Sequence, residues 1–173
     1  MQLCDDMPYN YNKGYIFLPL DDTALQNLQE SIEIRNMRLL KKSKFHVSLV
    51  CVKNIESVQE GIGDRIIELF CNFAQKHPFS FQGYTGVFRY VVDKSGERRS
   101  LVAMCKLSNL DVFFDHVNRE LGLSIPYQPT HVTLYTLKQD QGIGLNSQED
   151  IQKMTEDVTS ELSKDFIDEI TKS

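Results

Sequence analysis

The most constraining feature of the chain is a pair of short segments with nearly the same sequence, placed 85 residues apart. Residues 45–49 read Phe-His-Val-Ser-Leu, and residues 130–134 read Thr-His-Val-Thr-Leu. Each segment belongs to a stretch that reads as strand, helix and strand, over residues 14–52 and 98–137. No linker rich in proline, serine or glycine separates the two stretches. The repetition therefore predicts one domain built from two related halves.

Both segments alternate apolar and polar residues with the period of a β-strand. In a strand, residues i and i+2 point to the same face. His46 and Ser48 therefore share one face of their strand, and His131 and Thr133 share one face of theirs. The apolar residues between them occupy the opposite faces, where helices can cover them. If the two halves are related by pseudo-symmetry, the two imidazole–hydroxyl pairs face each other across a groove.

Two imidazoles and two hydroxyl groups suit the cleavage of a phosphodiester without a metal ion. A neutral imidazole can take a proton from the attacking water or ribose hydroxyl, and an imidazolium can give a proton to the leaving oxygen. Both tasks need a pKa near the working pH, which histidine has unaided. The hydroxyl groups can donate hydrogen bonds to the non-bridging phosphate oxygens, where negative charge grows in the transition state.

With these two motifs the chain resembles the 2H phosphoesterase superfamily. That group includes 2′-5′ RNA ligase-like proteins, cyclic phosphodiesterases and enzymes that degrade 2′-5′ or cyclic oligonucleotide signals. The resemblance implies His46 and His131 as the catalytic residues, and Ser48 and Thr133 as the phosphate-binding residues. It also implies that the histidine of the first motif is more often the acid and that of the second more often the base.

The element order agrees with this superfamily over residues 14–140, and no family-specific sequence motif is present outside the two motifs. Serine in the first motif is an accepted variant. Many members have proline directly before the second histidine, where this chain has Thr130 preceded by Pro129. The motif itself is intact, so the departure concerns only how the chain enters that strand.

Four further residues are candidates for substrate contact. Tyr135 follows Thr133 by two residues and is expected on the motif face, where it can stack on a base; stacking of a base on an aromatic ring contributes roughly 1–3 kcal/mol. Tyr15 on the first strand, Lys44 before the first motif and Tyr127 before the second are the others. Packing or solvation is the alternative reading for each of these side chains.

The remaining chain is expected to add helices and a hairpin to the two motif strands. A helix is predicted after Asp21 and Asp22, with a basic stretch after it, and Ser-x-x-acid capping boxes predict three more helix starts. Strands that break at a turn signal predict a long hairpin. The expected spans are a helix from 21 to 32, a helix from 57 to 73, a hairpin over 79–107, a helix from 108 to 121 and a last helix from 147 to 170.

Together these elements predict an α+β fold of the bilobal, pseudo-symmetric 2H phosphoesterase type. Two antiparallel-rich sheets would face a central groove, with helices outside. Residues 1–145 form the two-lobed domain in this interpretation. Residues 146–173 form an acidic amphipathic helix that docks on the same domain, with the binding of a protein partner as the alternative.

Charge argues against a protein that coats DNA or long RNA. The chain carries 24 acidic and 19 basic residues, a net charge of −5, and eight of the acids lie in residues 146–173. The body is therefore neutral, whereas coating proteins depend on a broad cationic surface. A nucleotide or a short oligonucleotide is the expected substrate.

The scattered cysteines predict reduced thiols and a cytoplasmic protein. The four cysteines form no Cys-x-x-Cys pair, so neither a zinc site nor another metal site is expected, and no cofactor motif is present. The apolar run at residues 15–20 is too short to cross a membrane. No membrane partner is expected.

The sequence leaves three functions open. The first is an enzyme that opens a 2′,3′-cyclic phosphate or cleaves a 2′-5′ or 3′-5′ linkage, including the degradation of an oligonucleotide signal. The second is a non-catalytic module that binds a nucleotide or an RNA end with the same residues. The third is an interaction protein that acts through residues 147–173.

Overall fold

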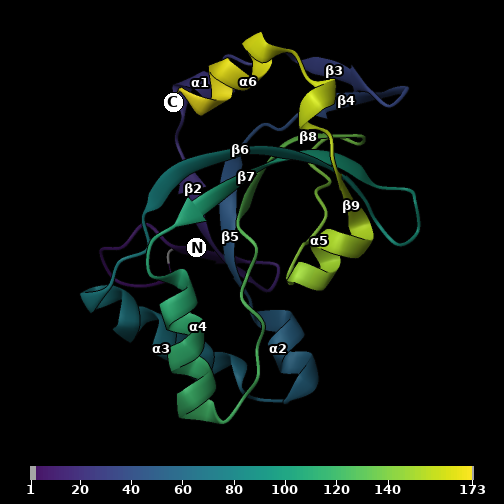
Figure 1. Ribbon diagram of the computed structural model, residues 1–173. Helices are drawn as coiled ribbons and strands as arrows, with labels where there is room; N and C mark the ends of the chain where they lie inside the picture. Colours follow the sequence, from purple (N-terminus) through teal and green to yellow (C-terminus); the bar gives the residue numbers. More distant parts are fainter. Residues whose placement is uncertain (1–2, 173) are drawn as a thin grey trace.

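The computed structural model describes residues 3–172, which form a single antiparallel sheet, six α-helices and one 3₁₀-helix (Figure 1). In chain order the elements are β1 (Asn10–Asn12), β2 (Tyr15–Leu20), α1 (Thr23–Gln26), β3 (Ser31–Ile34), β4 (Met37–Lys41), β5 (Phe45–Cys51), α2 (Val52–Val58), α3 (Gly63–Lys76), β6 (Phe81–Val92), β7 (Arg99–Leu107), α4 (Leu110–Leu121), β8 (His131–Thr136), α5 (Gln148–Met154), β9 (Thr155–Asp157), η1 (Thr159–Glu161) and α6 (Lys164–Thr171).

The sheet runs in the order β1-β2-β5-β8-β7-β6-β9, and the β3–β4 hairpin joins it through a short pairing of β4 with β8. Every strand pairing is antiparallel. The expected α+β class with an antiparallel-rich sheet is therefore confirmed. The two separate sheets are not observed, because β5 and β8, the two motif strands, pair with each other and make the sheet continuous.

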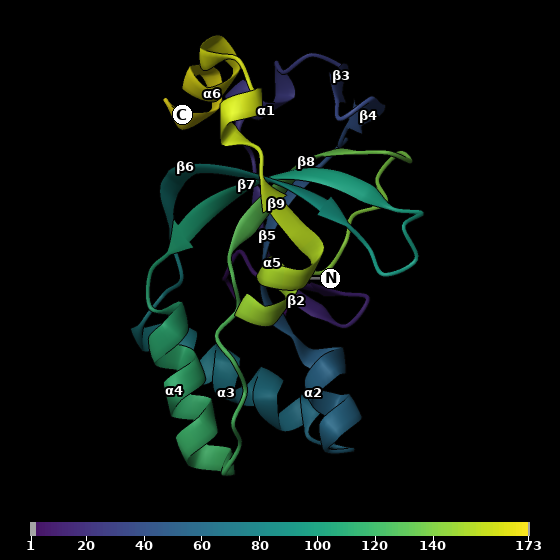
Figure 2. The same cartoon turned by 45° about the vertical axis from the view of Figure 1, so that its right-hand side comes forward.

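Apart from α5, which lies beside the sheet, the helices gather at two ends of the molecule, and Figures 1 and 2 agree on this arrangement. Helices α3 and α4 lie side by side at one end, and α1 and α6 lie together at the other, near the β3–β4 hairpin. The larger core joins both groups of helices to the sheet. A smaller core lies between α5, the loop before it and one face of β6 and β7; it contains Val91, Val102, Ile143, Leu145 and Ile151.

The second strand–helix–strand unit, built from β7, α4 and β8, follows the sequence prediction closely. The predicted hairpin over 79–107 is confirmed as β6 and β7, with its turn at residues 93–96. The predicted helix from 108 is confirmed as α4, although its N-cap residue, Asn109, makes no side-chain capping bond. The Ser108 hydroxyl instead donates to the Pro78 carbonyl, 3.1 Å away.

The first unit differs from its prediction between β2 and β5. The Asp22 carboxylate caps the helix at Ala24 as expected, but α1 ends at Gln26. The segment predicted as the rest of the helix and the basic stretch forms the β3–β4 hairpin instead. Its turn residues Arg35 and Asn36 both have positive φ, 53° and 63°, as a two-residue hairpin turn of type I′ requires. The helix prediction for residues 27–32 is therefore wrong.

The predicted helix start at Ser57 is also wrong. Helix α2 already runs through Ser57, whose hydroxyl donates to the Asn54 carbonyl. The Glu56 carboxylate accepts the amides of Gly61 and Gly63, and α3 begins there. Glu56, four residues before the expected acid Glu60, thus satisfies the free amides at the helix start.

The C-terminal segment is not one helix. Ser147 caps α5 as predicted, by accepting the amide of Asp150, but the helix ends at Met154. Residues 155–157 then form the edge strand β9 on β6, and a separate helix, α6, completes the segment. Three apolar residues of the C-terminal segment, Ile151, Val158 and Ile170, are buried in the body. The segment therefore packs on the body by a strand and two short helices in place of the single helix that was predicted.

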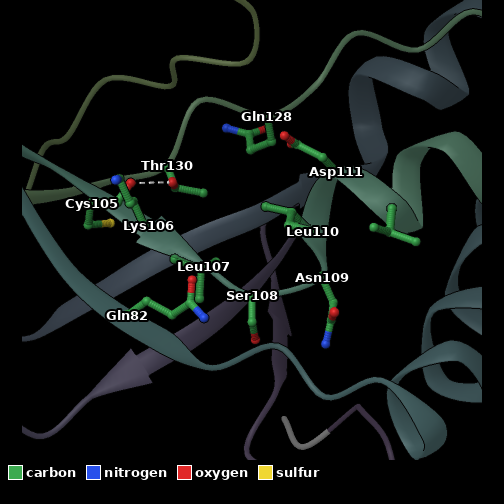
Figure 3. A pocket seen from close by; sticks show the side chains of 11 residues that line it. Gln82, Cys105, Lys106, Leu107, Ser108, Asn109, Leu110, Asp111, Gln128 and Thr130 are labelled. Carbon is green, nitrogen blue, oxygen red and sulfur yellow. Dashed lines mark hydrogen bonds between the residues drawn. The ribbon is translucent and has the colours of Figure 1, made fainter.

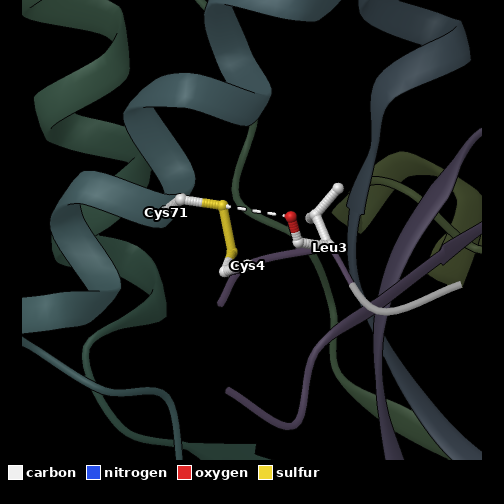
Figure 4. The surroundings of a disulfide bond; sticks show 3 residues. All are labelled: Leu3, Cys4 and Cys71. Carbon is white, nitrogen blue, oxygen red and sulfur yellow. Dashed lines mark hydrogen bonds between the residues drawn. A yellow bond between two sulfur atoms is a disulfide. The ribbon is translucent and has the colours of Figure 1, made fainter. Parts of the chain in front are cut away.

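Two of the four cysteines form a disulfide bond. Cys4 in the N-terminal segment is joined to Cys71 on α3, with the Cys71 sulfur 3.9 Å from the Leu3 carbonyl oxygen (Figure 4). Cys51 and Cys105 are free and buried. The prediction that all four cysteines are reduced is wrong for the first pair, because the fold brings residues 67 positions apart into contact.

Candidate functional site

The two motif strands are neighbours in the sheet, and one residue pair sets their register. Val47 of β5 lies opposite Val132 of β8 in an antiparallel pairing. Both valines are fully buried, as expected for the apolar face of each strand. An antiparallel pair has a local two-fold axis perpendicular to the sheet, so the residues that flank the two valines are brought together in a symmetric arrangement.

This register brings the four predicted motif residues onto one face. Continuing the register by one residue on each side of the valine pair puts His46 across from Thr133 and Ser48 across from His131. Side chains directly opposite one another on a pair of strands are within contact range. The sequence predicted two separate imidazole–hydroxyl pairs, and the sheet joins them side by side, each histidine beside the hydroxyl residue of the other strand.

His131 is buried and oriented by the backbone. Its side chain is 6% exposed, and its Nδ1 lies 3.4 Å from the Pro129 carbonyl oxygen. A carbonyl can only accept, so this contact favours the tautomer with the proton on Nδ1 and leaves the lone pair on Nε2. Burial lowers the pKa of His131 to about 4, against a smaller opposing effect of the Pro129 carbonyl.

The environment of His46 is different. Its imidazole is partly exposed and makes no hydrogen bond within residues 3–172, although the Phe17 ring lies 5.0 Å away between centroids. Burial lowers the pKa of His46 to about 4, and the positive charges of Lys42 and His131 lower it further. His46 is thus held by ring packing, with both ring nitrogens available.

The two hydroxyl residues are partly exposed on the same face. The hydroxyl groups of Ser48 and Thr133 form no hydrogen bond with the part of the chain that the structure describes. Their donor capacity is therefore free for a ligand. A phosphate placed over the valine pair would meet a hydroxyl from each strand.

The loop after β8 forms a wall beside this face. A β-carbon added to Gly142 would lie 3.9 Å from Thr133 Oγ1, and one added to Gly144 would overlap the Tyr15 hydroxyl. A side chain at residue 144 would therefore require Tyr15 to shift. The side chain of Gln128 donates to the Leu145 carbonyl, 2.6 Å away, and ties this loop to the segment that enters β8.

Tyr15, one of the predicted substrate-contact residues, lies on the same face of β2 as Phe17, which contacts His46. It pairs with Cys51, and Phe17, two residues further along β2, pairs with Ser48 across a β-bulge in β5. Its hydroxyl accepts a hydrogen bond from Asn146 Nδ2 at 3.2 Å, and the Lys53 ammonium lies 4.9 Å from its ring centre. Burial raises the pKa of Tyr15 to about 12.

Tyr135 does not share the motif face, contrary to the prediction. Val102 of β7 pairs with Thr133 and the adjacent Leu101 pairs with Tyr135, so Leu134 is an extra residue that forms a β-bulge. A bulge reverses the alternation of side chains beyond it. Tyr135 is therefore turned to the opposite face, where it is fully buried in the larger core. Its hydroxyl donates to the Gln29 carbonyl at 2.8 Å.

Neither Lys44 nor Tyr127 forms a hydrogen bond or ion pair with the four motif residues in the part of the chain that the structure describes. Lys44 is exposed, and the exposed Tyr127 donates to Asp115 of α4 at 2.6 Å. Phe17 and Lys42 lie beside the motif residues instead. Phe17 contacts His46, and Lys42 lies close enough to lower the pKa of His46. Alternation along β2 could have placed Phe17 on this face, but no sequence signal separates Lys42 from the lysines around it.

A hollow elsewhere on the surface contains none of the four motif residues. It lies where β7 ends and α4 begins, and Gln82, Lys106, Asn109, Asp111 and Gln128 are among its lining residues (Figure 3). Thr130, also in its lining, donates its hydroxyl to the Cys105 carbonyl. The side chain of Thr130 is thus committed to holding β8 against β7, directly before His131.

Within residues 3–172, no three His, Cys, Asp or Glu side chains are grouped so that they could hold a metal ion. None of the helices in that range is long and apolar enough to cross a membrane. Comparisons with protein-family models, curated proteins and solved structures gave no match to the chain. The functional interpretation therefore depends on the motifs and on their geometry.

Proposed function

We propose that the protein is a metal-independent phosphoesterase that cleaves a ribose-linked phosphodiester by general acid–base catalysis with two histidines. The substrate class is a 2′,3′-cyclic phosphate, or a 2′-5′ or 3′-5′ linkage, in a nucleotide or a short oligonucleotide. The observation that carries the proposal is the Val47–Val132 pairing, which puts two imidazoles and two free hydroxyl groups on one face.

His131 is the general base in this proposal. With its Nδ1 directed at the Pro129 carbonyl, Nε2 takes the proton of the attacking water or 2′-hydroxyl while the new P–O bond forms. His46 is the general acid, and it gives a proton to the leaving oxygen as the old P–O bond breaks. Ser48 and Thr133 donate hydrogen bonds to the non-bridging oxygens, which carry more charge in the transition state than in the substrate.

Because both histidines have a low pKa, protonation of the general acid His46 depends on binding of the substrate. Near neutral pH both imidazoles of the free protein are uncharged, because each pKa is about 4. An anion beside an imidazole favours its protonated form. Binding of the phosphate thus raises the pKa of His46, so that His46 takes up from solvent the proton that it later gives to the leaving oxygen.

The decisive experiment is an assay of the EDTA-treated protein against 2′,3′-cyclic mononucleotides, 2′-5′ and 3′-5′ oligoadenylates, cyclic oligonucleotides and RNA with a cyclic-phosphate end. The expected result is turnover of at least one of them, with EDTA having no effect. His131→Ala is the blank, and His77→Ala is the matched control because His77 is exposed at the end of α3.

The products identify the reaction. A 2′-phosphate or a 3′-phosphate reports the opening of a cyclic phosphate, and a cyclic-phosphate end reports attack by the neighbouring ribose hydroxyl. Turnover that requires added metal, or that survives in His131→Ala, would contradict the mechanism. Binding of these ligands without turnover would instead identify a non-catalytic nucleotide-binding module.

A further inference from the structure

Lys42 is held beside the motif face by contacts on both sides. It lies in the short connection between β4 and β5, and its backbone amide donates to the Leu134 carbonyl at 2.9 Å. The next residue, Ser43, donates its amide and its hydroxyl to the Asp140 carboxylate at 2.9 Å and 2.7 Å. The connection is therefore clamped between β8 and the loop after β8, next to Thr133.

The ammonium group of Lys42 has no fixed partner. It is partly buried, and within residues 3–172 it forms neither a hydrogen bond nor an ion pair. Its neighbour Lys41 is the contrast, since that ammonium donates to the carbonyls of Gln26 and Leu28 and pairs with Glu30 at 3.0 Å. Cations withdrawn from water in proteins are normally paired, so this partly buried and unpaired ammonium, whose charge acts on His46, points to an anion that binds there.

The charges around Lys42 agree with this interpretation. Burial lowers the pKa of Lys42, the charge of Asp140 raises it and that of Lys13 lowers it. The positive charge of Lys42 in turn lowers the pKa of His46. The Asp140 carboxylate accepts its hydrogen bonds from Ser43 and acts on Lys42 only through its charge, so the Lys42 ammonium keeps its donors for a ligand.

We propose that Lys42 binds a non-bridging oxygen of the scissile phosphate and makes this site favour a doubly charged phosphoryl group. The inference rests on the proposed function. A diester is a monoanion, whereas the transition state and a phosphomonoester product each carry two negative charges. At one distance a cation attracts a dianion twice as strongly as a monoanion, so Lys42 stabilises the transition state more than the substrate. Lys42 stays protonated while the protons move through His131 and His46.

The test uses two small probes that differ in charge, methyl phosphate as the dianion and dimethyl phosphate as the monoanion. Their binding to the full chain at pH 7.5 is followed by NMR through the ring protons of the histidines. Lys42→Gln should weaken methyl phosphate binding by roughly tenfold or more, the value of a charge-assisted hydrogen bond, and should affect dimethyl phosphate less. Lys42→Arg should keep most of the affinity, and the exposed control Lys44→Gln should change neither.

Kinetics supply the second readout, since Lys42→Gln should lower kcat more than it raises KM on the active substrate. Methyl phosphate that binds equally to the wild type and Lys42→Gln, or does not bind to the wild type, would overturn the inference. Turnover unaffected by Lys42→Gln would overturn it as well, while the proposed function would stand. Probe binding that depends on Lys42, without turnover of any substrate, would refute the proposed function and leave Lys42 as the cation of an anion site.

Discussion

The two motif strands have the same local sequence pattern and different surroundings. On β8, His131 is buried and its Nδ1 is directed at the Pro129 carbonyl. On β5, His46 is partly exposed, lies against Phe17 and has the charge of Lys42 nearby. One imidazole is therefore fixed in a single tautomer, which suits a base, and the other is free to gain a proton when an anion binds, which suits an acid. Pseudo-symmetric strands thus need not carry equivalent histidines.

The largest expected effect is the loss of either histidine. His46→Ala and His131→Ala should each lower kcat by about 10²–10⁴-fold, the usual contribution of a general acid or base. His77→Ala should retain full activity. A variant of either motif histidine that keeps wild-type kcat in a direct product assay would break the assignment of roles.

The two hydroxyl residues should matter less, because each leaves one donor in place. We expect Ser48→Ala and Thr133→Ala to lower kcat by about tenfold to a hundredfold, below the loss seen when a sole oxyanion donor is removed. The swaps Ser48→Thr and Thr133→Ser keep both hydroxyls and are the matched controls. Equal losses in the swaps and in the alanine variants would show that packing, not the hydroxyl group, is responsible.

Acid should destabilise the fold through the same histidines. Both have a pKa near 4 in the folded protein and an ordinary value of 6.5, so between these values the unfolded chain binds more protons. Stability is therefore complete above about pH 6.5 and falls as the pH decreases toward 4. Urea midpoints at pH 7.5, 5.5 and 4.5 should decline less in His131→Gln than in the wild type. An identical decline would contradict the depressed pKa of His131.

The smallest effects are expected from Tyr-to-Phe substitutions, whose consequences should differ between the two faces of the sheet. Tyr135→Phe removes a buried hydrogen bond to the Gln29 carbonyl and should cost about 1 kcal/mol of folding stability, with unchanged kcat and KM. Tyr15→Phe removes the hydroxyl that Asn146 contacts on the motif face and should raise KM by a fewfold. An altered KM in Tyr135→Phe, measured beside Tyr15→Phe, would contradict the placement of Tyr135.

The sequence was most informative where strong local signals were not opposed by long-range strand pairing. Turn residues and apolar periodicity both predicted the hairpin of β6 and β7, helix α4 and strand β8. Between β2 and β5 the spacing of Leu25 and Leu28 fits a helix, and only the Arg35–Asn36 turn and the long-range pairing of β4 with β8 reveal a hairpin. Tertiary pairing overrode a weak local preference there.

Period-two alternation within each motif was enough to predict that His46 lies with Ser48 and His131 with Thr133. That alternation could not predict that the two pairs meet, since the Val47–Val132 contact joins strands 85 residues apart. It also could not predict the bulge at Leu134 that turns Tyr135 away, the disulfide between Cys4 and Cys71, or the isolation of Lys42. Each of these depends on hydrogen bonds and packing between distant segments, and such partners exist only after the chain has folded.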